Sequence, residues 1–288
     1  MDELRALAQP VIRQALREDI GSGDVTVGAL IPPARRIEAV LIAKAPGVVA
    51  GLEIARWVFT AVKPSVRFTA KTVDGRTVRR GQTLATLEGS ASVLLSAERT
   101  ALNLLGHLSG IATLTRRFVE AIDPFSAAIM DTRKTLPGLR ALEKYAVRAG
   151  GGRNHRMGLH DAVLIKTNHI DILRQETKGV SRILVLAVER ARRAYPKLSV
   201  TVEVRDLEEF RQALDARPDV ILLDNWRIPE MRKAVRLRAG RKQLLLEVSG
   251  GVTLKNVRAI AATGVERISI GRLTHSAPVL DVSLRVIP

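Results

Sequence analysis

The later part of the chain alternates short apolar runs with longer segments in which apolar residues recur at helical spacing. The apolar runs predict strands at residues 127–130, 162–165, 200–202, 220–223, 243–246 and 267–270. The segments between them predict helices over residues 183–194, 207–216, 229–237 and 254–262. Repeated strand–helix units indicate a parallel sheet, either doubly wound or closed into a barrel. These strands are too few for a regular closed barrel, so we look for further strands within residues 133–161.

The first 110 residues show a mixed pattern of strands and helices. Strands are predicted at residues 36–44, 66–72 and 82–87 around a turn at Asp74-Gly75, and a helix at residues 52–62. A long helix capped by Ser90 or Ser92 is predicted next, with its first break or bend at Gly110. This helix is expected to join two domains.

Polar or charged residues follow each predicted strand of the later part. They are Asp131 to Thr135, Lys166 to His169, Glu203, Asp224 with Asn225, Glu247 with Ser249 to Gly251, and Gly271 with Thr274 and His275. In parallel α/β architectures the active site lies at the carboxyl ends of the strands. We therefore expect these residues to converge on one site.

Cations form one part of this set. Arg133, Lys134, Arg156 and Lys166, with His155 beside them, are suited to bind carboxylates or phosphates. The predicted ligand is a small molecule with several negative charges.

Two carboxylates and a glycine-rich loop form the other part. Glu203 and Asp224 are predicted on adjacent strands, where they can share Mg²⁺ or bind the hydroxyl groups of a sugar. Ser249 to Gly251 and Gly271 offer backbone N–H groups to a phosphate, as late loops of α/β barrels do. The sum predicts a Mg²⁺-assisted reaction on a phosphorylated, ribosyl-containing anion.

The composition narrows the classes of partner. The chain has 288 residues with 46 Lys and Arg against 29 Asp and Glu, a formal charge of +17, which favours polyanions. Only 3% of the residues are aromatic, which argues against stacking on single-stranded nucleic acid. The absence of cysteine excludes disulfides, a thiolate nucleophile and a cysteine-bound metal. The acidic N-terminus and the lack of a long apolar run predict a soluble, cytoplasmic protein without a membrane partner.

Some of these residues have a structural alternative. Asp131 and Glu247 can simply neutralise neighbouring cations, and residues 150–152 can form an ordinary flexible glycine loop. His107 is placed in the long helix and His160 at a helix or loop edge, and neither is given a role. The role of His169 stays open.

A set of segments spans nearly the whole chain in a characteristic order. They are Glu18 to Asp24, Glu98-Arg99, Leu108 to Ala112, Asp131 to Thr135, Gly150 to Arg156, Leu164 to His169, Leu222 to Asn225, Glu247 to Gly251 and Leu273 to Ser276. Together they resemble the signature set of the quinolinate phosphoribosyltransferase family, also called nicotinate-nucleotide pyrophosphorylase (carboxylating). Any one segment is weak evidence, whereas the whole set is specific.

The resemblance implies an α/β fold with an N-terminal α/β sandwich domain over residues 1–110, completed by residues 276–288. An open parallel α/β barrel, similar to a TIM barrel, is implied over residues 111–275. The implied activity is that of a pentosyltransferase of NAD biosynthesis. It transfers phosphoribosyl from phosphoribosyl pyrophosphate to quinolinate with decarboxylation, giving nicotinate mononucleotide, pyrophosphate and CO₂. A homodimer or a hexamer of dimers is implied, without a nucleic-acid partner.

The resemblance also implies roles for individual residues. Arg133, His155, Arg156 and Lys166 would hold the two carboxylates of quinolinate, helped by Arg99 reaching in from a partner subunit. Thr132 would also bind substrate. Lys134 would meet the diphosphate, while Glu203 and Asp224 would bind the ribose hydroxyls and Mg²⁺, directly or through water or substrate. The phosphates would be bound by Ser249, Gly250, Gly251, Gly271 and His275. The implied catalytic residues are Lys134, Lys166, Glu203 and Asp224.

Two residues depart from the family pattern. Thr167 stands where an acidic residue is common and is expected to affect how Lys166 is oriented. Arg272 stands where a small residue is common and adds charge near a phosphate.

Lys166 favours the quinolinate enzyme over a paralogous branch, associated with molybdate-transport operons, that usually lacks this lysine. A basic nucleic-acid-binding protein is the alternative from another class, supported by net charge alone.

Overall fold

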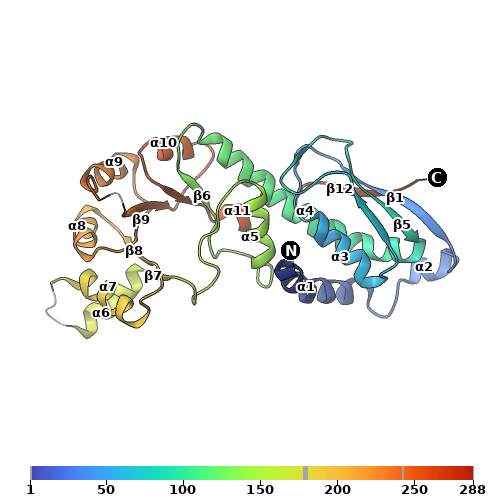
Figure 1. Ribbon diagram of the computed structural model, residues 1–288, viewed down its shortest axis with the longest axis horizontal. Helices are drawn as coiled ribbons and strands as arrows, with labels where there is room; N and C mark the ends of the chain where they lie inside the picture. The colour runs from blue at the N-terminus through green and yellow to red at the C-terminus, as the bar shows by residue number, and fades with distance from the viewer. Residues whose placement is uncertain (1, 178–180, 242, 288) are drawn as a thin grey trace. The chain divides into compact units, whose positions relative to one another are not determined.

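The computed structural model describes residues 2–177, 181–241 and 243–287, and the chain divides into two compact units (Figure 1). Unit 1 comprises Met1–Arg116, Lys134–Gly152 and Arg272–Pro288. Unit 2 comprises Arg117–Arg133 and Arg153–Gly271. Each unit contains its own main sheet.

Unit 1 contains a four-stranded antiparallel sheet in the order β12–β1–β5–β3. Its strands are β1 (Arg36–Ala43), β3 (Arg67–Ala70), β5 (Thr83–Ser90) and β12 (Val282–Ile287), and a separate short pair consists of β2 (Gly47–Val48) and β4 (Thr77–Val78). Ala39, Leu41 and Ala43 are buried in alternation along β1, so one face of the sheet packs on the interior of the unit.

Helices complete unit 1. They are α1 (Asp2–Ile20), α2 (Val25–Leu30), α3 (Leu52–Val62), α5 (Arg140–Ala149), α11 (Arg272–His275) and the first part of α4 (Ala91–Ala121). Asp74 accepts the N–H groups of Gly51 (2.7 Å) and Leu52 (3.1 Å) at the start of α3. It also accepts the hydroxyl of Tyr145 on α5 (2.5 Å). Burial and the Asp74 carboxylate raise the pKa of Tyr145, so its hydroxyl remains a donor and ties α5 to α3. Residues 134–152, which the sequence analysis placed in the later domain, therefore pack within unit 1.

Helix α4 runs through Gly110 without a break, so the predicted end or bend at this residue is wrong. A Cβ atom at Gly110 would lie 2.1 Å from the carbonyl oxygen of Pro278, so glycine lets the C-terminal segment of unit 1 approach the helix. Sequence reasoning missed this contact because helix termination and close backbone approach both favour glycine.

The substitution Gly110→Ala is expected to lower the free energy of unfolding by about 2 kcal/mol, because the new methyl group overlaps a backbone carbonyl. Urea unfolding followed by circular dichroism measures the change. Gly28→Ala is the matched control, because Gly28 lies in helix α2 with nothing within 4 Å of its Cβ position. Its stability should stay equal or rise. Equal losses in both variants would contradict the steric explanation.

Unit 2 contains a six-stranded parallel sheet in the order β6–β11–β10–β9–β8–β7. The strands are β6 (Ala128–Met130), β7 (Val163–Ile165), β8 (Val200–Val204), β9 (Val220–Asp224), β10 (Leu245–Ser249) and β11 (Arg267–Ser269). The helices are α6 (Thr167–Glu176), α7 (Ile183–Ala194), α8 (Leu207–Ala216), α9 (Ile228–Leu237) and α10 (Val257–Ala261). Successive helices contact one another from α6 to α10. The predicted α/β fold class, with an open parallel sheet in the later part, is confirmed.

Two details of the later part of the chain differ from the sequence-based predictions. Residues 133–161, all of them described, contain helix α5 and one bridge between Met130 and Arg153 rather than a further strand. The helix predicted from residue 254 begins at Val257. The preceding loop is held by Asn256, which accepts the Thr253 N–H (2.8 Å) and donates to the Gly251 carbonyl (3.0 Å).

The two faces of the parallel sheet differ in chemistry. Val204, Leu223, Val248 and Ile268 lie in one row across neighbouring strands and are fully buried. Side chains alternate between faces along a strand, so residues one position before or after this row point to the opposite face. That opposite face carries Glu203, Asp224, Glu247, Ser249 and Ser269. One side of the sheet forms the core, and the other presents polar groups.

Candidate active site

The end of β6 and the segment after the glycine run lie side by side in unit 2. Arg153 donates its N–H to the Ile129 carbonyl (2.8 Å), and its own carbonyl accepts the Asp131 N–H (3.2 Å). The fully buried Asp131 carboxylate accepts the backbone N–H of His155 (2.9 Å). These bonds bring the predicted segment Thr132-Arg133 to His155 and Arg156, although the two segments are far apart in the sequence. The N–H groups of Gly150, Gly151 and Gly152 donate to carbonyls of residues 146–148 in α5, so this segment is a hydrogen-bonded continuation of that helix.

His155 has both ring nitrogens engaged within the protein. Nδ1 accepts the backbone N–H of Arg156 (2.7 Å), so the ring proton lies on Nε2, which is 3.3 Å from Glu247 Oε1. The same Glu247 oxygen accepts the hydroxyl of Ser269, and Glu247 is 1% exposed. The expected contact of His155 with a substrate carboxylate stays a prediction, and the structure adds a hydrogen bond from the Arg156 backbone to the His155 ring. Asp131 and Glu247, which were interpreted as neutralising groups, hold His155 in place.

Arg133 and Arg156 lie close enough to repel one another. Burial lowers the pKa of Arg156, the charge of Arg133 lowers it further, and Asp161 partly opposes both effects. Arg156 donates one guanidinium hydrogen bond to the Ala162 carbonyl (3.0 Å), while its buried Nε donates to no described residue. Two neighbouring half-buried guanidinium groups form a strong site for an anion with two carboxylates.

Lys166 and Glu203 lie at the ends of the paired strands β7 and β8. Lys166 is exposed, and its backbone N–H donates to Nδ1 of His169 (2.9 Å), which gives His169 a structural role at the start of α6. Glu203 Oε1 accepts the N–H (3.3 Å) and the hydroxyl (3.0 Å) of Thr167. The sequence analysis linked Thr167 to Lys166, whereas its side chain contacts Glu203.

Asp224 is fixed by two neutral donors. Its Oδ1 accepts the hydroxyl of Ser249 (2.6 Å), and its Oδ2 accepts the side-chain amide of Asn225 (2.9 Å). Asn225 adopts a left-handed backbone conformation (φ 59°) and donates its N–H to the Ser249 carbonyl (2.9 Å). Sequence reasoning gave Asn225 no role, although its place directly after Asp224 at a strand end was a signal.

The loop after β10 presents backbone donors. Gly250 has φ +85°, and a Cβ atom there would lie 2.1 Å from Asn225 Oδ1, so only glycine fits beside this amide. The N–H groups of Gly250 and Gly251 donate to no acceptor in the described part of the chain. Exposed adjacent N–H groups of this kind suit a phosphate. Gly271 follows the neighbouring strand β11.

Three predicted site residues belong to unit 1. Lys134 and His275 are neighbours there, because Thr274, which precedes His275, donates its hydroxyl to the Lys134 carbonyl (2.7 Å). His275 Nδ1 lies 2.6 Å from the hydroxyl of Ser276. Arg99 is exposed on α4, and no hydrogen bond or ion pair joins it to the other two.

The carboxylates of this site could bind Mg²⁺ only together with ligands from water or substrate. No group of three or more His, Asp or Glu side chains within the described ranges could hold a metal. Glu203 and Asp224 provide two carboxylates, so further oxygen ligands would come from water or substrate phosphates, as is usual for Mg²⁺.

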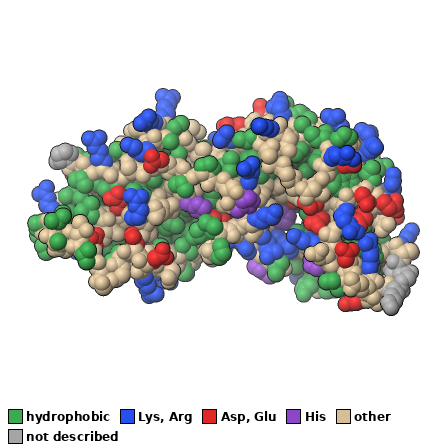
Figure 2. All heavy atoms as spheres, turned by 180° about the vertical axis from the view of Figure 1, so that it is seen from behind, with side chains coloured by type: hydrophobic (Ala, Val, Ile, Leu, Met, Phe, Trp, Pro, Cys, Tyr) green, Lys and Arg blue, Asp and Glu red, His purple; other side chains and the backbone are tan. Residues whose placement is uncertain are grey.

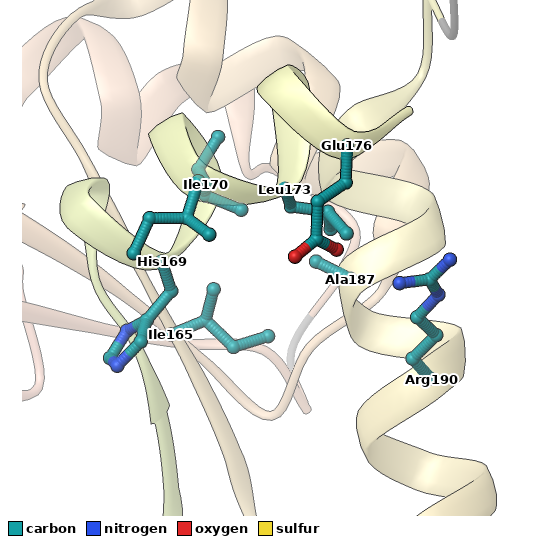
Figure 3. A pocket seen from close by; sticks show the side chains of 8 residues that line it. Ile165, His169, Ile170, Leu173, Glu176, Ala187 and Arg190 are labelled. Carbon is teal, nitrogen blue, oxygen red and sulfur yellow. The ribbon is translucent and has the colours of Figure 1, made fainter. Parts of the chain in front are cut away.

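A separate hollow of about 300 Å³ lies between α6 and α7 (Figure 3). Its wall is mostly apolar, and Glu176 and Arg190 project toward it from the two helices. None of the predicted binding residues lines this hollow, and apolar walls do not suit a ligand with several negative charges. This hollow therefore offers no alternative to the predicted anion site at the strand ends.

On the face drawn in Figure 2, Lys and Arg side chains are interspersed with Asp and Glu side chains. This face does not present the purely basic surface expected of a nucleic-acid interface. No helix within the described ranges is long and apolar enough to cross a membrane.

The fold and the site define an α/β protein with cationic side chains, carboxylates and backbone N–H groups at the carboxyl ends of a parallel sheet. Residues 24–109 match the family model for the N-terminal domain of quinolinate phosphoribosyl transferase, and residues 111–285 match the model for its C-terminal domain. The chain belongs to this family.

Individual relatives agree over nearly the full length. The chain is 43% identical over 281 residues to "Nicotinate-nucleotide pyrophosphorylase [carboxylating]" of Mycobacterium leprae, with 96% of each chain covered. The nicotinate-nucleotide pyrophosphorylase structure from Francisella tularensis has a TM-score of 0.90 and 36% identity, covering 98% of this chain and 96% of that one. The Ehrlichia chaffeensis structure of the same name has a TM-score of 0.89 and 38% identity, covering 97% and 98%.

Proposed function

We propose that this chain is a carboxylating nicotinate-nucleotide pyrophosphorylase. It transfers the phosphoribosyl group of phosphoribosyl pyrophosphate to quinolinate and releases pyrophosphate and CO₂. The observation that carries the proposal is the neighbouring pair Arg133 and Arg156, whose repulsion contributes to the lowered pKa of Arg156. Quinolinate has two adjacent carboxylates, and binding them between these guanidinium groups replaces repulsion by charge-assisted hydrogen bonds. The names of the full-length relatives support the same reaction.

The binding groups divide between the two substrates. Arg133 and Arg156 hold the quinolinate carboxylates, with Lys166 beside them, and so orient the pyridine nitrogen toward the ribose. Glu203 and Asp224 bind the ribose hydroxyls, and the N–H groups of Gly250 and Gly251 bind phosphate oxygens. Lys134 and His275 belong to unit 1, and their contacts to diphosphate and phosphate remain predictions from the family resemblance. When bound, Mg²⁺ stabilises the negative charge that develops on the departing pyrophosphate.

The reaction needs no side-chain nucleophile. The bond from ribose C1 to the pyrophosphate oxygen breaks, and the pyridine nitrogen supplies the electron pair for the new bond to C1. The carboxylate next to the positively charged ring nitrogen then leaves as CO₂, and the electron pair it leaves on the ring carbon takes up a proton. The cationic side chains hold the dicarboxylate throughout, and the carboxylates of Glu203 and Asp224 lie where positive charge develops on the ribose.

The direct test is a turnover assay with the purified chain. Quinolinate, phosphoribosyl pyrophosphate and Mg²⁺ together should give equal amounts of nicotinate mononucleotide and CO₂, and omission of any one should abolish both products. Turnover with nicotinate but not with quinolinate would assign the chain to a different phosphoribosyltransferase activity and reject the proposal.

We extend the proposal to a homo-oligomer in which Arg99 completes the site of a partner subunit. Arg99 is exposed on α4 and has no ion pair among the described residues, which supports this role. Mixing inactive Arg99→Ala and Lys166→Ala subunits should restore up to about a quarter of the wild-type activity, since half of randomly formed dimers carry one intact site. No recovery despite demonstrated subunit exchange would reject a shared site.

A further inference from the structure

Thr167 contacts Glu203 through two donors. Thr167 is the first residue of α6, and both its backbone N–H (3.3 Å) and its hydroxyl (3.0 Å) point to Glu203 Oε1. Glu203 lies on β8, which pairs in parallel with β7, the strand before α6. The contact therefore joins the loop after one strand to the polar face of the next.

The contact with Thr167 orients the Glu203 carboxylate and leaves its Oε2 atom available to a ligand. A carboxylate accepts hydrogen bonds on both oxygens, yet across the described residues only Thr167 hydrogen-bonds to Glu203, and only at Oε1. With Oε1 held by two donors, rotation of the side chain is restricted, and Oε2 can accept from a ligand. Asp224, on the same face of the sheet, is held in a comparable way by Ser249 and Asn225.

We propose that Thr167 is a positioning residue that fixes the Glu203 carboxylate for the ribose hydroxyls and the associated Mg²⁺ of phosphoribosyl pyrophosphate. The inference rests on the proposed function and assigns Thr167 to one of its two substrates. An ionised acidic side chain at residue 167 could not donate to Glu203 and would repel it. Thr167 replaces that repulsion with a hydrogen bond, so the start of α6 places no carboxylate against Glu203.

The test compares Thr167→Val with Thr167→Ser in the full-length protein. Valine has nearly the shape of threonine but no hydroxyl, whereas serine restores the donor. Thr167→Val should lower kcat/KM for phosphoribosyl pyrophosphate about tenfold, while KM for quinolinate changes less than about twofold. Thr167→Ser should recover most of the loss. A crystal structure of Thr167→Val should show the Glu203 carboxylate turned away from its wild-type position.

Thr177→Val is the matched control, because Thr177 also loses a hydroxyl hydrogen bond, to the Leu173 carbonyl (2.7 Å), at the other end of α6. It should leave both substrates unaffected. Equal losses for the two substrates, an effect as large in Thr177→Val, or an unmoved Glu203 carboxylate in Thr167→Val would each overturn the positioning role. Absence of wild-type turnover would instead reject the proposed function, and the position of Glu203 in the two crystal structures would still decide the role of Thr167.

Discussion

Arg156→Met is expected to lower kcat/KM for quinolinate about a thousandfold, equivalent to about 4 kcal/mol. Methionine keeps much of the apolar stem of arginine but removes the guanidinium group that binds a carboxylate. The loss should fall mainly on quinolinate, because Arg156 lies beside Arg133 and forms no hydrogen bond or ion pair with Glu203 or Asp224, the two carboxylates assigned to ribose. Steady-state kinetics with each substrate varied in turn measures this division.

The same variant is expected to fold normally. In the wild-type protein, burial and the charge of Arg133 both disfavour the charged form of Arg156, which is why its pKa is lowered. Removing the charge removes a repulsion, which offsets the lost hydrogen bond to the Ala162 carbonyl. The free energy of unfolding should therefore change by less than about 1 kcal/mol.

Arg192→Met is the control for loss of one positive charge. Arg192 pairs with Asp219 (3.3 Å) and donates to the Arg217 carbonyl (3.0 Å) at the amino end of β9, away from the catalytic strand ends. Its kcat/KM should remain within about twofold of wild type. A similar loss in both arginine variants would mean that the effect comes from general electrostatic attraction of the substrate, rather than from specific hydrogen bonds between Arg156 and a carboxylate.

The periodicity of the sequence predicted most of the fold because most helices and strands are simple amphipathic or buried segments. The predicted helices at residues 52–62, 183–194 and 207–216 have the observed bounds. One error arises where a tertiary contact, rather than a helix end, explains the residue type. Gly110 lies within α4, and its missing Cβ leaves room for the carbonyl of Pro278.

The candidate site was predictable in its residue types but not in its internal connections. Parallel topology alone brings strand ends together, so Glu203 and Asp224 could be placed on one face from the order of the strands. Which donor reaches which acceptor depends on distances between strands, which a sequence does not contain. The engagement of both ring nitrogens of His155, and the donation from Thr167 to Glu203 rather than any effect on Lys166, follow only from coordinates.

Glu203→Gln is expected to lower kcat about a thousandfold, because it removes negative charge beside the ribose where positive charge develops in the transition state. Glutamine at this position removes the charge and preserves the hydrogen bonds. Its amide oxygen can still accept both hydrogen bonds from Thr167, so the side chain keeps its orientation and loses mainly its charge. Asp224→Asn would also disturb the hydrogen bonds, because its new amide donor would face the amide donor of Asn225.

If charge explains the loss in Glu203→Gln, a second kinetic change is expected in this variant. If the carboxylate also helps to hold Mg²⁺ with the substrate, the Mg²⁺ concentration for half-maximal rate should rise, while KM for quinolinate stays within about twofold. Glu208→Gln, an exposed carboxylate on α8 with a long 3.6 Å contact to Arg211, controls for charge alone and should match wild type. If Glu203→Gln keeps kcat within about tenfold of wild type, the carboxylate does not stabilise the ribosyl transition state. Thr167 would then hold a group of structural importance only, so the kinetics of this one variant bear on both roles.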